Sequence, residues 1–243
     1  MKDILTDIVA HTHSLSILPL VKITGTETET AIEAMAEDRS VILSAKSHEP
    51  VEEFQGVFGM PNLDKLKLHL NYEEYKEDAK IELTRAVRNG EEIPTGIHFE
   101  NTTGDFKNDY RFMNADIINE KLKTVKFKGA NWDVSIEPSI SSIQRLKYQA
   151  QAHSEESTFQ VKTENNNLVL FFGDAGTHAG SFVFQSDIES KLKQTWAWPV
   201  SQVLSILNLS GDKKLMISDA GAMMISVDSG LVNYNYILPA QTK

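Results

Sequence analysis

Histidines, carboxylates and one glycine-rich stretch are the residue types in this sequence that could perform chemistry. His11 and His13 are two residues apart, but no histidine at helical spacing and no neighbouring pair of carboxylates completes a metal site. We therefore interpret them as polar residues at the end of a helix. The run Gly173–Gly180 matches neither the dinucleotide fingerprint nor the phosphate-binding loop with its Lys-Ser/Thr pair. Because it lies between LVLFF and SFVFQ, we expect a hairpin loop.

The sequence also lacks a recognisable nucleophile. His178 and Asp174 have the chemistry of a general base and the group that orients it, but no Gly-x-Ser-x-Gly stretch supplies a serine for them to activate. The chain contains no cysteine, which excludes a thiol nucleophile, a thiolate metal site and a disulfide framework. We expect no catalytic site, no metal and no cofactor, and so a protein that is not an enzyme.

The distribution of basic residues is more informative. The chain has 34 acidic and 24 basic residues and a net charge of −10, which argues against a protein that coats nucleic acid with a uniformly basic surface. Glu137–Ala152 nevertheless predicts a helix, opened by Pro138, whose polar face carries Arg145 and Lys147 and no carboxylate. Its apolar stripe is expected to contain Ile140, Ile143, Leu146 and Ala150.

Three further segments are predicted to be short amphipathic helices, namely Lys2–Ser14, a helix opened by Pro61 and ending near Asn71, and Pro199–Leu209. Counted over Met1–Ser14, Pro61–Asn71, Ser139–Ala152 and Pro199–Asn208, the four helical segments carry the cations Lys2, Lys65, Lys67, Arg145 and Lys147 against the acids Asp3, Asp7 and Asp64. They are therefore net positive in an acidic chain. Two further cations, Lys191 and Lys193, lie just before the last helix.

Short strands fill most of the remaining sequence. The predicted strands alternate or are continuously apolar, and they are LVKIT, TAIEAMA, VILSA, AKIELTRAV, GIHFEN, TFQVKT, LVLFF, SFVFQ, KQTWAW, KKLMIS, AMMISVD and VNYNYIL. The stretch Phe106–Val125 has no clear period and is interpreted as a linker. With 243 residues, 41% of them hydrophobic, the chain is long enough for one large or two ordinary domains.

The order of elements suggests an internal repeat. Pro61 and Pro199 each open the second helix of a half, and 199 − 61 = 138. Ile4 and Ile140 lie in the first helices, and 140 − 4 = 136. Two nearly equal offsets imply two copies of one helix-and-strand unit, although side-chain identity between the halves is negligible. The alternative is that four short helices are scattered by chance in an α+β protein.

Two stretches resemble a known family. EPSISSIQRLKYQAQAHSEESTFQVKTENNNLVLFF is similar to the helix and hairpin that open the second domain of the DNA polymerase sliding clamps of T-even bacteriophages. GDKKLMISDAGAMMISVDSGLVNYNYILPAQTK resembles the paired strands and the closing Tyr-x-Leu-Pro-Ala segment of these clamps. That closing segment is also similar to the C-terminal tail of proliferating-cell nuclear antigen. The likeness is weaker before Glu137, where a long acidic loop follows Asn71.

The resemblance implies an α+β fold of two clamp domains, each with two short helices packed on antiparallel sheets. The domains would span residues 1–113 and 127–243, with a connector at 114–126. Three identical subunits would close head to tail into a ring with the helices lining the hole, through an edge strand near Tyr110–Asn114 and one near Ser181–Gln185. The ring would encircle double-stranded DNA without reading its sequence. The DNA-binding candidates are Lys65, Lys67, Arg145 and Lys147, with Lys2, Lys191 and Lys193 as weaker ones.

The resemblance also implies partner proteins. A DNA polymerase would be tethered for processive synthesis, a clamp loader would act on the ring, and partners would bind by short peptides with apolar anchors. The groove for these peptides would be formed by the connector and the end of the chain. Its candidate residues are Ile117, Ile118, Leu122, Ile237, Leu238, Pro239 and Ala240.

Two alternatives remain open at this stage. One is a β-rich viral structural or assembly scaffold that does not encircle DNA. The other is an enzyme of unrecognised type whose site is built from scattered acids and histidines. The opening residues MKDILTDIVAH are not a signal peptide, and no stretch is long enough to span a membrane. We therefore expect a cytoplasmic protein, in the host cell if it is viral.

Overall fold

The computed structural model describes residues 1–88, 90–123, 127, 129–174, 176, 178–189 and 191–241. The chain divides into two compact units. The first contains Met1–Lys126 with Ser229–Tyr234, and the second contains Phe127–Asp228 with Asn235–Lys243. Each unit is α+β with antiparallel sheets, as the sequence predicts, so the predicted fold class is confirmed.

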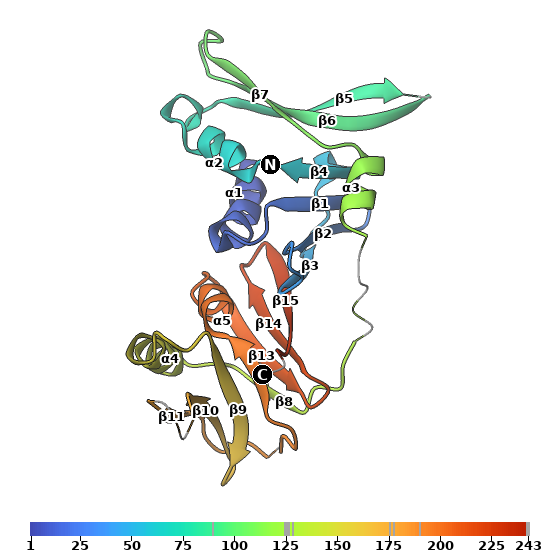
Figure 1. Cartoon of the computed structure of the whole chain (residues 1–243). Coiled ribbons are helices and arrows are strands. Elements are labelled where there is room, and N and C mark those ends of the chain that lie inside the picture. The colour runs from blue at the N-terminus through green and yellow to red at the C-terminus, as the bar shows by residue number, and fades with distance from the viewer. Residues whose placement is uncertain are drawn as a thin grey trace. The chain divides into compact units, whose positions relative to one another are not determined.

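The first unit is built from three α-helices, three short 3-10 helices and seven strands among the described residues (Figure 1). The α-helices are α1 (Lys2–His11), α2 (Leu63–Asn71) and α3 (Ala115–Lys121), and the 3-10 helices are His13–Leu15, Glu52–Phe54 and Glu73–Tyr75. The strands are β1 (Leu20–Gly25), β2 (Thr30–Met35), β3 (Ile42–Ser47), β4 (Gly56–Pro61), β5 (Lys80–Arg88), β6 (Glu91–Glu100) and β7 (Lys107–Arg111).

The second unit has two α-helices and the remaining strands (Figure 1). The helices are α4 (Ile140–Ala152) and α5 (Val200–Leu207). The strands are β8 (Val134–Ile136), β9 (Thr158–Glu164), β10 (Asn167–Phe172), β11 (Gly180–Gln185), β12 (Trp196–Pro199), β13 (Asp212–Ser218), β14 (Ala222–Asp228) and β15 (Val232–Pro239). Strand β15 begins in the first unit and ends in the second.

The two units repeat one topology. The strand order β4-β1-β2-β3 of the first unit recurs as β12-β9-β10-β11 in the second, and β5-β6-β7 recurs as β13-β14-β15. The helices repeat at a nearly constant offset, because α4 begins 138 residues after α1 (140 − 2) and α5 begins 137 residues after α2 (200 − 63). In each unit the two repeated helices pack beside one another, α1 with α2 and α4 with α5 (Figure 1). The interpretation of the sequence as two copies of one unit is therefore confirmed.

Pro61 and Pro199 mark the repeat in a different way from the one predicted. Pro61 is the last residue of β4 and does not open a helix, whereas Pro199 is both the last residue of β12 and the N-cap of α5. Each is paired with the first residue of the neighbouring strand, Leu20 in β1 or Thr158 in β9. Proline is tolerated at such a strand end, and its missing N–H and fixed φ stop the ladder just before the helix begins.

The segment Phe106–Val125, interpreted from the sequence as a linker, is largely regular. It contains β7 and α3, and the Asn114 side chain caps α3 by accepting a hydrogen bond from the backbone N–H of Ile117 at 3.0 Å. Strands β4 and β8 were also not predicted. Residues 124 and 125, the last of the predicted linker, and residue 126, the last of the predicted connector, lie outside the described part of the chain.

His11 is the last residue of α1, at the end of a helix as the sequence predicts. It is buried, and its ring stacks on Tyr234 with 4.5 Å between the ring centroids. The Asp7 carboxylate accepts hydrogen bonds from Tyr234 Oη at 2.7 Å and Ser229 Oγ at 2.9 Å. Although burial alone raises the pKa of Asp7, the hydrogen bonds from His11, Tyr234 and Ser229 lower it below its ordinary value. These residues join α1 to β15 within the first unit.

Candidate nucleic-acid interface

Helix α4 is fixed at its start and by one buried leucine. Ser139 is the N-cap, and its Oγ accepts a hydrogen bond from the backbone N–H of Ser142 at 3.0 Å. Ser142 Oγ in turn donates to the carbonyl oxygen of Phe184 in β11 at 2.7 Å. Leu146 is fully buried. The helix therefore has a defined rotation about its axis, which decides where its charged side chains point.

The predicted apolar stripe of α4 is wrong at Ile140. This side chain is 84% exposed, whereas Ile143 and Ala150 are half-buried and Leu146 is buried. At 100° per residue, Ile140 lies about 120° around the helix from Leu146, on the same side as Lys147 and away from the buried face. The outer face, opposite Leu146, contains the exposed Ser141, Gln144 and Tyr148, and Gln144 Nε2 lies 3.5 Å from Tyr148 Oη.

Arg145 and Lys147 are both exposed and flank this outer face. Each is next to Leu146 in sequence, so the two side chains leave the helix about 100° to either side of the buried leucine. Long basic side chains at such margins can lay their methylene stems along the neighbouring surface and keep their charges in water. The outer face of α4 is thus neutral along its middle and positive along both sides.

Helix α2 repeats this arrangement. Leu66 is fully buried, and its neighbours Lys65 and Lys67 are both exposed. Asp64 and Leu68 lie on the outer face between the two lysines, and Leu68 is 53% exposed. Both helices therefore contain a buried leucine between two exposed cations, written Lys-Leu-Lys in α2 and Arg-Leu-Lys in α4.

The remaining helical residues add little positive charge. Burial, together with the nearby charge of Lys65, lowers the pKa of His69 in α2, so this side chain is neutral at pH 7. Helix α5 contains no charged residue. In α1, Lys2 is half-buried and its Nζ donates to the carbonyl oxygens of Tyr75 at 2.5 Å and Lys76 at 3.4 Å. The Lys2 ammonium therefore ties α1 to the turn after α2, which leaves it less free for a phosphate.

The other predicted cations lie outside the helices. Lys191 and Lys193 are exposed and precede β12. The backbone N–H of Lys193 donates to the carboxylate of Asp219, at 2.9 Å and 3.1 Å to its two oxygens. This carboxylate also accepts from the backbone N–H of Gln194 at 3.2 Å. The segment is thereby anchored to the β13–β14 turn.

The residues predicted to bind partner peptides differ greatly in exposure. In and after α3, Ile117 is 45% exposed, while Ile118 and Leu122 are buried. Near the end of β15, Ile237 and Leu238 are both buried, Pro239 is exposed and Ala240 is half-buried. The buried residues can only support a binding surface from below. Ile117 and Pro239 are exposed and Ala240 is partly so, and these are the members of this set that a peptide could contact directly.

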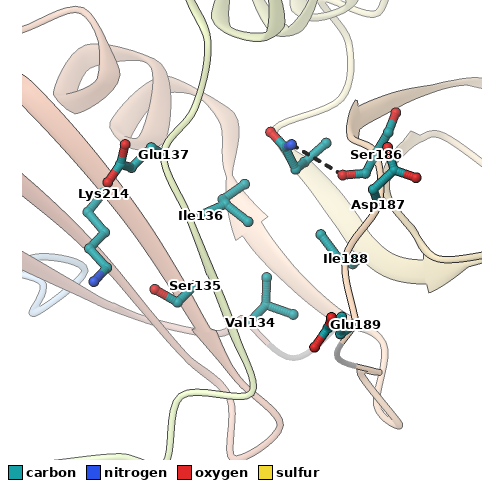
Figure 2. Close-up of a pocket in the computed structure, with 10 residues that line it drawn as sticks. Val134, Ser135, Ile136, Glu137, Ser186, Asp187, Ile188, Glu189 and Lys214 are labelled. Carbon is teal, nitrogen blue, oxygen red and sulfur yellow. Dashed lines mark hydrogen bonds between the residues drawn. The ribbon is translucent and has the colours of Figure 1, made fainter.

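The described residues also form an open cavity of about 600 Å³ in the second unit (Figure 2). Its walls are β8 and the residues that follow β11, and Glu137, Asp187 and Glu189 make it acidic, with Lys214 the single basic residue among those lining it. Among the residues that the structure describes, no three histidine, aspartate or glutamate side chains are grouped so that they could hold a metal ion. Nor does this part of the chain contain a helix long and apolar enough to cross a membrane.

The chain thus consists of two copies of a unit with paired helices and antiparallel sheets. No protein-family model matches the chain, and no curated protein matches it. Solved structures do match. Proliferating cell nuclear antigen (PCNA) from Thermococcus kodakaraensis has a TM-score of 0.69 and 10% identity, over 99% of this chain and 97% of that chain.

Two further solved structures are similar to the chain to about the same degree. PCNA from Entamoeba histolytica has a TM-score of 0.69 and 13% identity, over 98% of this chain and 96% of that chain. The structure described as the C-terminal region of FEN-1 bound to A. fulgidus PCNA has a TM-score of 0.67 and 10% identity, over 100% and 95%. At these identities the likeness establishes the fold alone. The chain therefore has the PCNA-type clamp fold.

Sequence reasoning found the cations on α2 and α4 but not the arrangement around them. It placed Ile140 inside, and it did not single out Gln144, Tyr148 or Leu68 on the outer faces. The signal was present, because Leu66 and Leu146 are each flanked on both sides by a basic residue. A buried residue between two cations requires that the cations lie on opposite margins of the exposed face.

Proposed function

We propose that this protein is a sliding clamp, a non-catalytic ring that encircles double-stranded DNA and tethers a DNA polymerase for processive synthesis. The observation that carries the proposal is the pair of basic residues around a buried leucine on both α2 and α4, in a chain with the clamp fold and a net charge of −10. Cations that contact phosphates without reading bases suit a protein that slides along DNA. The acidic remainder discourages binding elsewhere on the surface.

In this proposal three subunits close head to tail, with α1, α2, α4 and α5 lining the hole. Strands β7 and β11 are the outermost strands of their sheets among the described residues, so each has an edge available for pairing. The first edge is shifted from the predicted segment Tyr110–Asn114, because the N–H and C=O of Met113 are already bonded to Gly59 in β4, which leaves Lys107–Arg111. Heterologous contacts of this kind close into a ring when the rotation suits.

The partners belong to the same proposal. The A. fulgidus PCNA structure contains the C-terminal region of FEN-1, and we infer that peptides of a polymerase and of a clamp loader bind this chain as well. Ile117 and Pro239 are the exposed contacts proposed for such peptides. The proposal also includes a connector at 114–126 between domains at 1–113 and 127–243. It further includes an origin in a T-even-like bacteriophage and a cytoplasmic location.

Measuring the mass of the protein in solution tests whether three subunits assemble into a ring. Sedimentation or light scattering over a range of concentrations should show a trimer, and low-resolution imaging should show a ring. Val183 is an exposed residue of β11, so Val183→Lys should give monomers, while Val87→Lys on β5 should leave the trimer intact. A wild-type protein that stays monomeric at all concentrations, or a Val183→Lys trimer as stable as wild type, would favour the alternative of a scaffold protein that does not encircle DNA.

A further inference from the structure

The positive charge of the helices is concentrated in the second unit. In the first unit, Lys2, Asp3 and Asp7 give α1 one net negative charge. Helix α2 has one net positive charge, so the two helices together are neutral when their histidines are neutral. In the second unit, α5 has no charged residue, and α4 carries Arg145 and Lys147 without an acid. The second unit therefore supplies the net positive charge of the repeated helices.

Helices α2 and α4 can be compared position by position, because both contain a buried leucine between two exposed cations. The residues two before and two after that leucine lie about 160° around the helix from it, at the middle of the outer face. In α2 these places hold Asp64 and Leu68, and in α4 they hold Gln144 and Tyr148. All four side chains are exposed. A carboxylate and an aliphatic side chain in α2 thus correspond to an amide and a phenol in α4.

These differences make the two outer faces unequal toward a phosphate. The carboxylate of Asp64 lies between Lys65 and Lys67, where its charge repels an anion and offsets one of the two cations. At the corresponding place in α4, Gln144 Nε2 lies 3.5 Å from Tyr148 Oη. The amide can donate to the phenol oxygen, which leaves the phenol hydrogen for an acceptor outside the protein. Glutamine and tyrosine side chains are among those that contact DNA phosphates.

We propose that α4 is the principal DNA-contacting helix of each subunit. In this assignment Gln144 and Tyr148 donate hydrogen bonds to phosphates of double-stranded DNA, between the charges of Arg145 and Lys147. Phosphates fit this face because cations on both margins, with neutral donors between them, complement negatively charged oxygens. Helix α2 contacts the duplex more weakly, since Asp64 lies at the middle of its outer face. The assignment rests on the proposed clamp function and names the residues through which the ring touches DNA.

Exchanging the middle residues between the two helices tests the proposal. One variant gives α4 the residues of α2, through Gln144→Asp with Tyr148→Leu. The other gives α2 the residues of α4, through Asp64→Gln with Leu68→Tyr. Because all four side chains are exposed, both variants should fold, which chemical denaturation verifies. A third variant, Tyr148→Phe, keeps the aromatic ring and removes only the hydroxyl.

Two control variants make the same charge changes outside the four repeated helices. Gln55→Asp introduces a carboxylate at an exposed residue just before β4. Asp116→Gln removes an exposed acid from the first turn of α3, as Asp64→Gln does in α2. Both controls should bind DNA as the wild-type protein does, because the proposal assigns neither residue to the DNA-binding face.

Binding is measured by fluorescence anisotropy at several salt concentrations, with a short linear duplex whose open ends let a ring thread. The α4 variant should bind about tenfold more weakly than the wild-type protein, and the α2 variant about tenfold more tightly. Tyr148→Phe should weaken binding about threefold. Wild-type affinity of the α4 variant or of Tyr148→Phe would overturn the proposal, and so would an α2 variant that binds no more tightly than the wild-type protein.

A second measurement separates this failure from a failure of the clamp function. The wild-type protein is tested for retention on a duplex with blocked ends. If it is retained but the exchange variants bind as the wild-type protein does, only the assignment to α4 is overturned. If it is not retained, the clamp function is refuted, and the assignment to α4 with it.

Discussion

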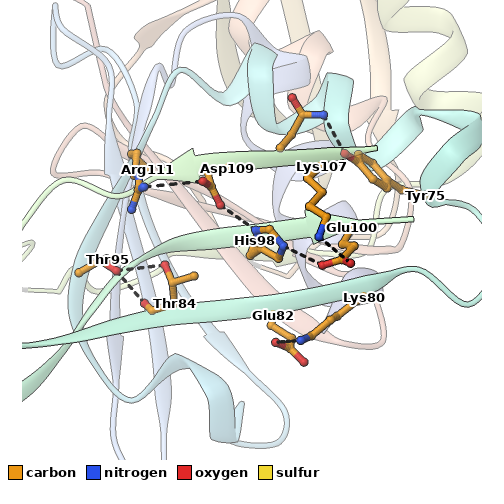
Figure 3. Close-up of polar contacts among 11 residues, drawn as sticks. Tyr75, Lys80, Glu82, Thr84, Thr95, His98, Glu100, Lys107, Asp109 and Arg111 are labelled. Atoms are coloured by element: carbon orange, nitrogen blue, oxygen red, sulfur yellow. Dashed lines mark hydrogen bonds and ion pairs between the residues drawn. The ribbon is translucent and has the colours of Figure 1, made fainter. Parts of the chain in front are cut away.

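His98 in β6 and Asp109 in β7 are directly opposite one another, and Nδ1 of the histidine lies 2.9 Å from Oδ1 of the aspartate (Figure 3). Nε2 of His98 lies 3.3 Å from Oε2 of Glu100, which also pairs with Lys107 at 3.0 Å. The hydrogen bond with Asp109, followed by that with Glu100, raises the pKa of His98 above its ordinary value. The protonated histidine therefore joins β6 to the strand proposed to form the subunit interface.

This cluster should make the stability of the protein depend on pH. Because the folded-state pKa is raised, the contribution of His98 is fully present below the unfolded pKa of about 6.5 and is lost as pH rises through the folded value. Replacing His98 with glutamine should lower the free energy of unfolding at acidic pH by less than about 1 kcal/mol, since the cluster is partly exposed. The free energies of unfolding of the variant and the wild-type protein should become equal at alkaline pH. Denaturant titrations at several pH values measure it.

The exposed Ile140, whose side chain has no titratable group, provides the control. Ile140→Ala should not alter how stability changes between mildly acidic and alkaline pH. An His98→Gln variant whose stability deficit grows as pH rises would have the opposite sign and would show that neutral His98 makes the stabilising contact.

The cap of α4 gives a second prediction. Ser139→Ala removes the hydroxyl that accepts from Ser142 N–H, and should destabilise the protein by about 1 kcal/mol. Ser141→Ala, an exposed change two residues later in the same turn, should alter stability by less than about 0.5 kcal/mol. Chemical denaturation compares the two. Equal effects would mean that the cap does not stabilise the helix.

Leu146 and Ile140 test how α4 is oriented. Leu146→Ala removes the fully buried side chain of the helix and should cost about 2–5 kcal/mol. Ile140→Ala alters a side chain that is 84% exposed and should cost less than about 0.5 kcal/mol. A large loss of stability for Ile140→Ala would support the stripe expected from the sequence instead of the rotation found in the structure.

Replacing Arg145 and Lys147 with alanine should impair loading or processive DNA synthesis while folding stays intact, because exposed charges contribute little to stability. The dependence of DNA binding on salt should weaken, with the slope of log K against log salt falling by about 0.9 for each phosphate that the variant no longer neutralises. The control is Lys46→Ala with Lys80→Ala, which removes the same charge from exposed strand residues. Wild-type processivity of the double α4 variant at raised salt would refute the assignment.

Most strands and four of the helices were predictable because their apolar residues recur at the period of the element. The alternation in LVKIT or AMMISVD survives in β1 and β14, where buried and half-buried residues alternate. Strand β8 has only three residues and β7 reads KNDYR, so neither shows a hydrophobic pattern. Strand β8 is extended because it pairs with β13, which is distant in sequence, and β7 is extended because it pairs with β6.

The candidate site was predictable in its charges but not in its geometry. Lys65, Lys67, Arg145 and Lys147 are exposed on helices, as the sequence indicates. What periodicity could not provide is the rotation of α4, which depends on Leu146 and on the contact of Ser142 with β11. The buried state of Ile237 and Leu238 likewise follows from the sheet that β15 joins, because two consecutive residues of a strand are both buried only where each face is covered.

Retention on DNA by topology tests the central claim most directly. The protein is incubated with a linear duplex that has one free end, so that a ring can thread on without a loader, and the end is then blocked with a bulky bound protein. After a high-salt wash the protein should remain on the blocked duplex, and a restriction cut that creates a new free end should release it. The account is contradicted if the protein leaves blocked and cut duplexes at the same rate, because a molecule held only by charge is indifferent to DNA ends.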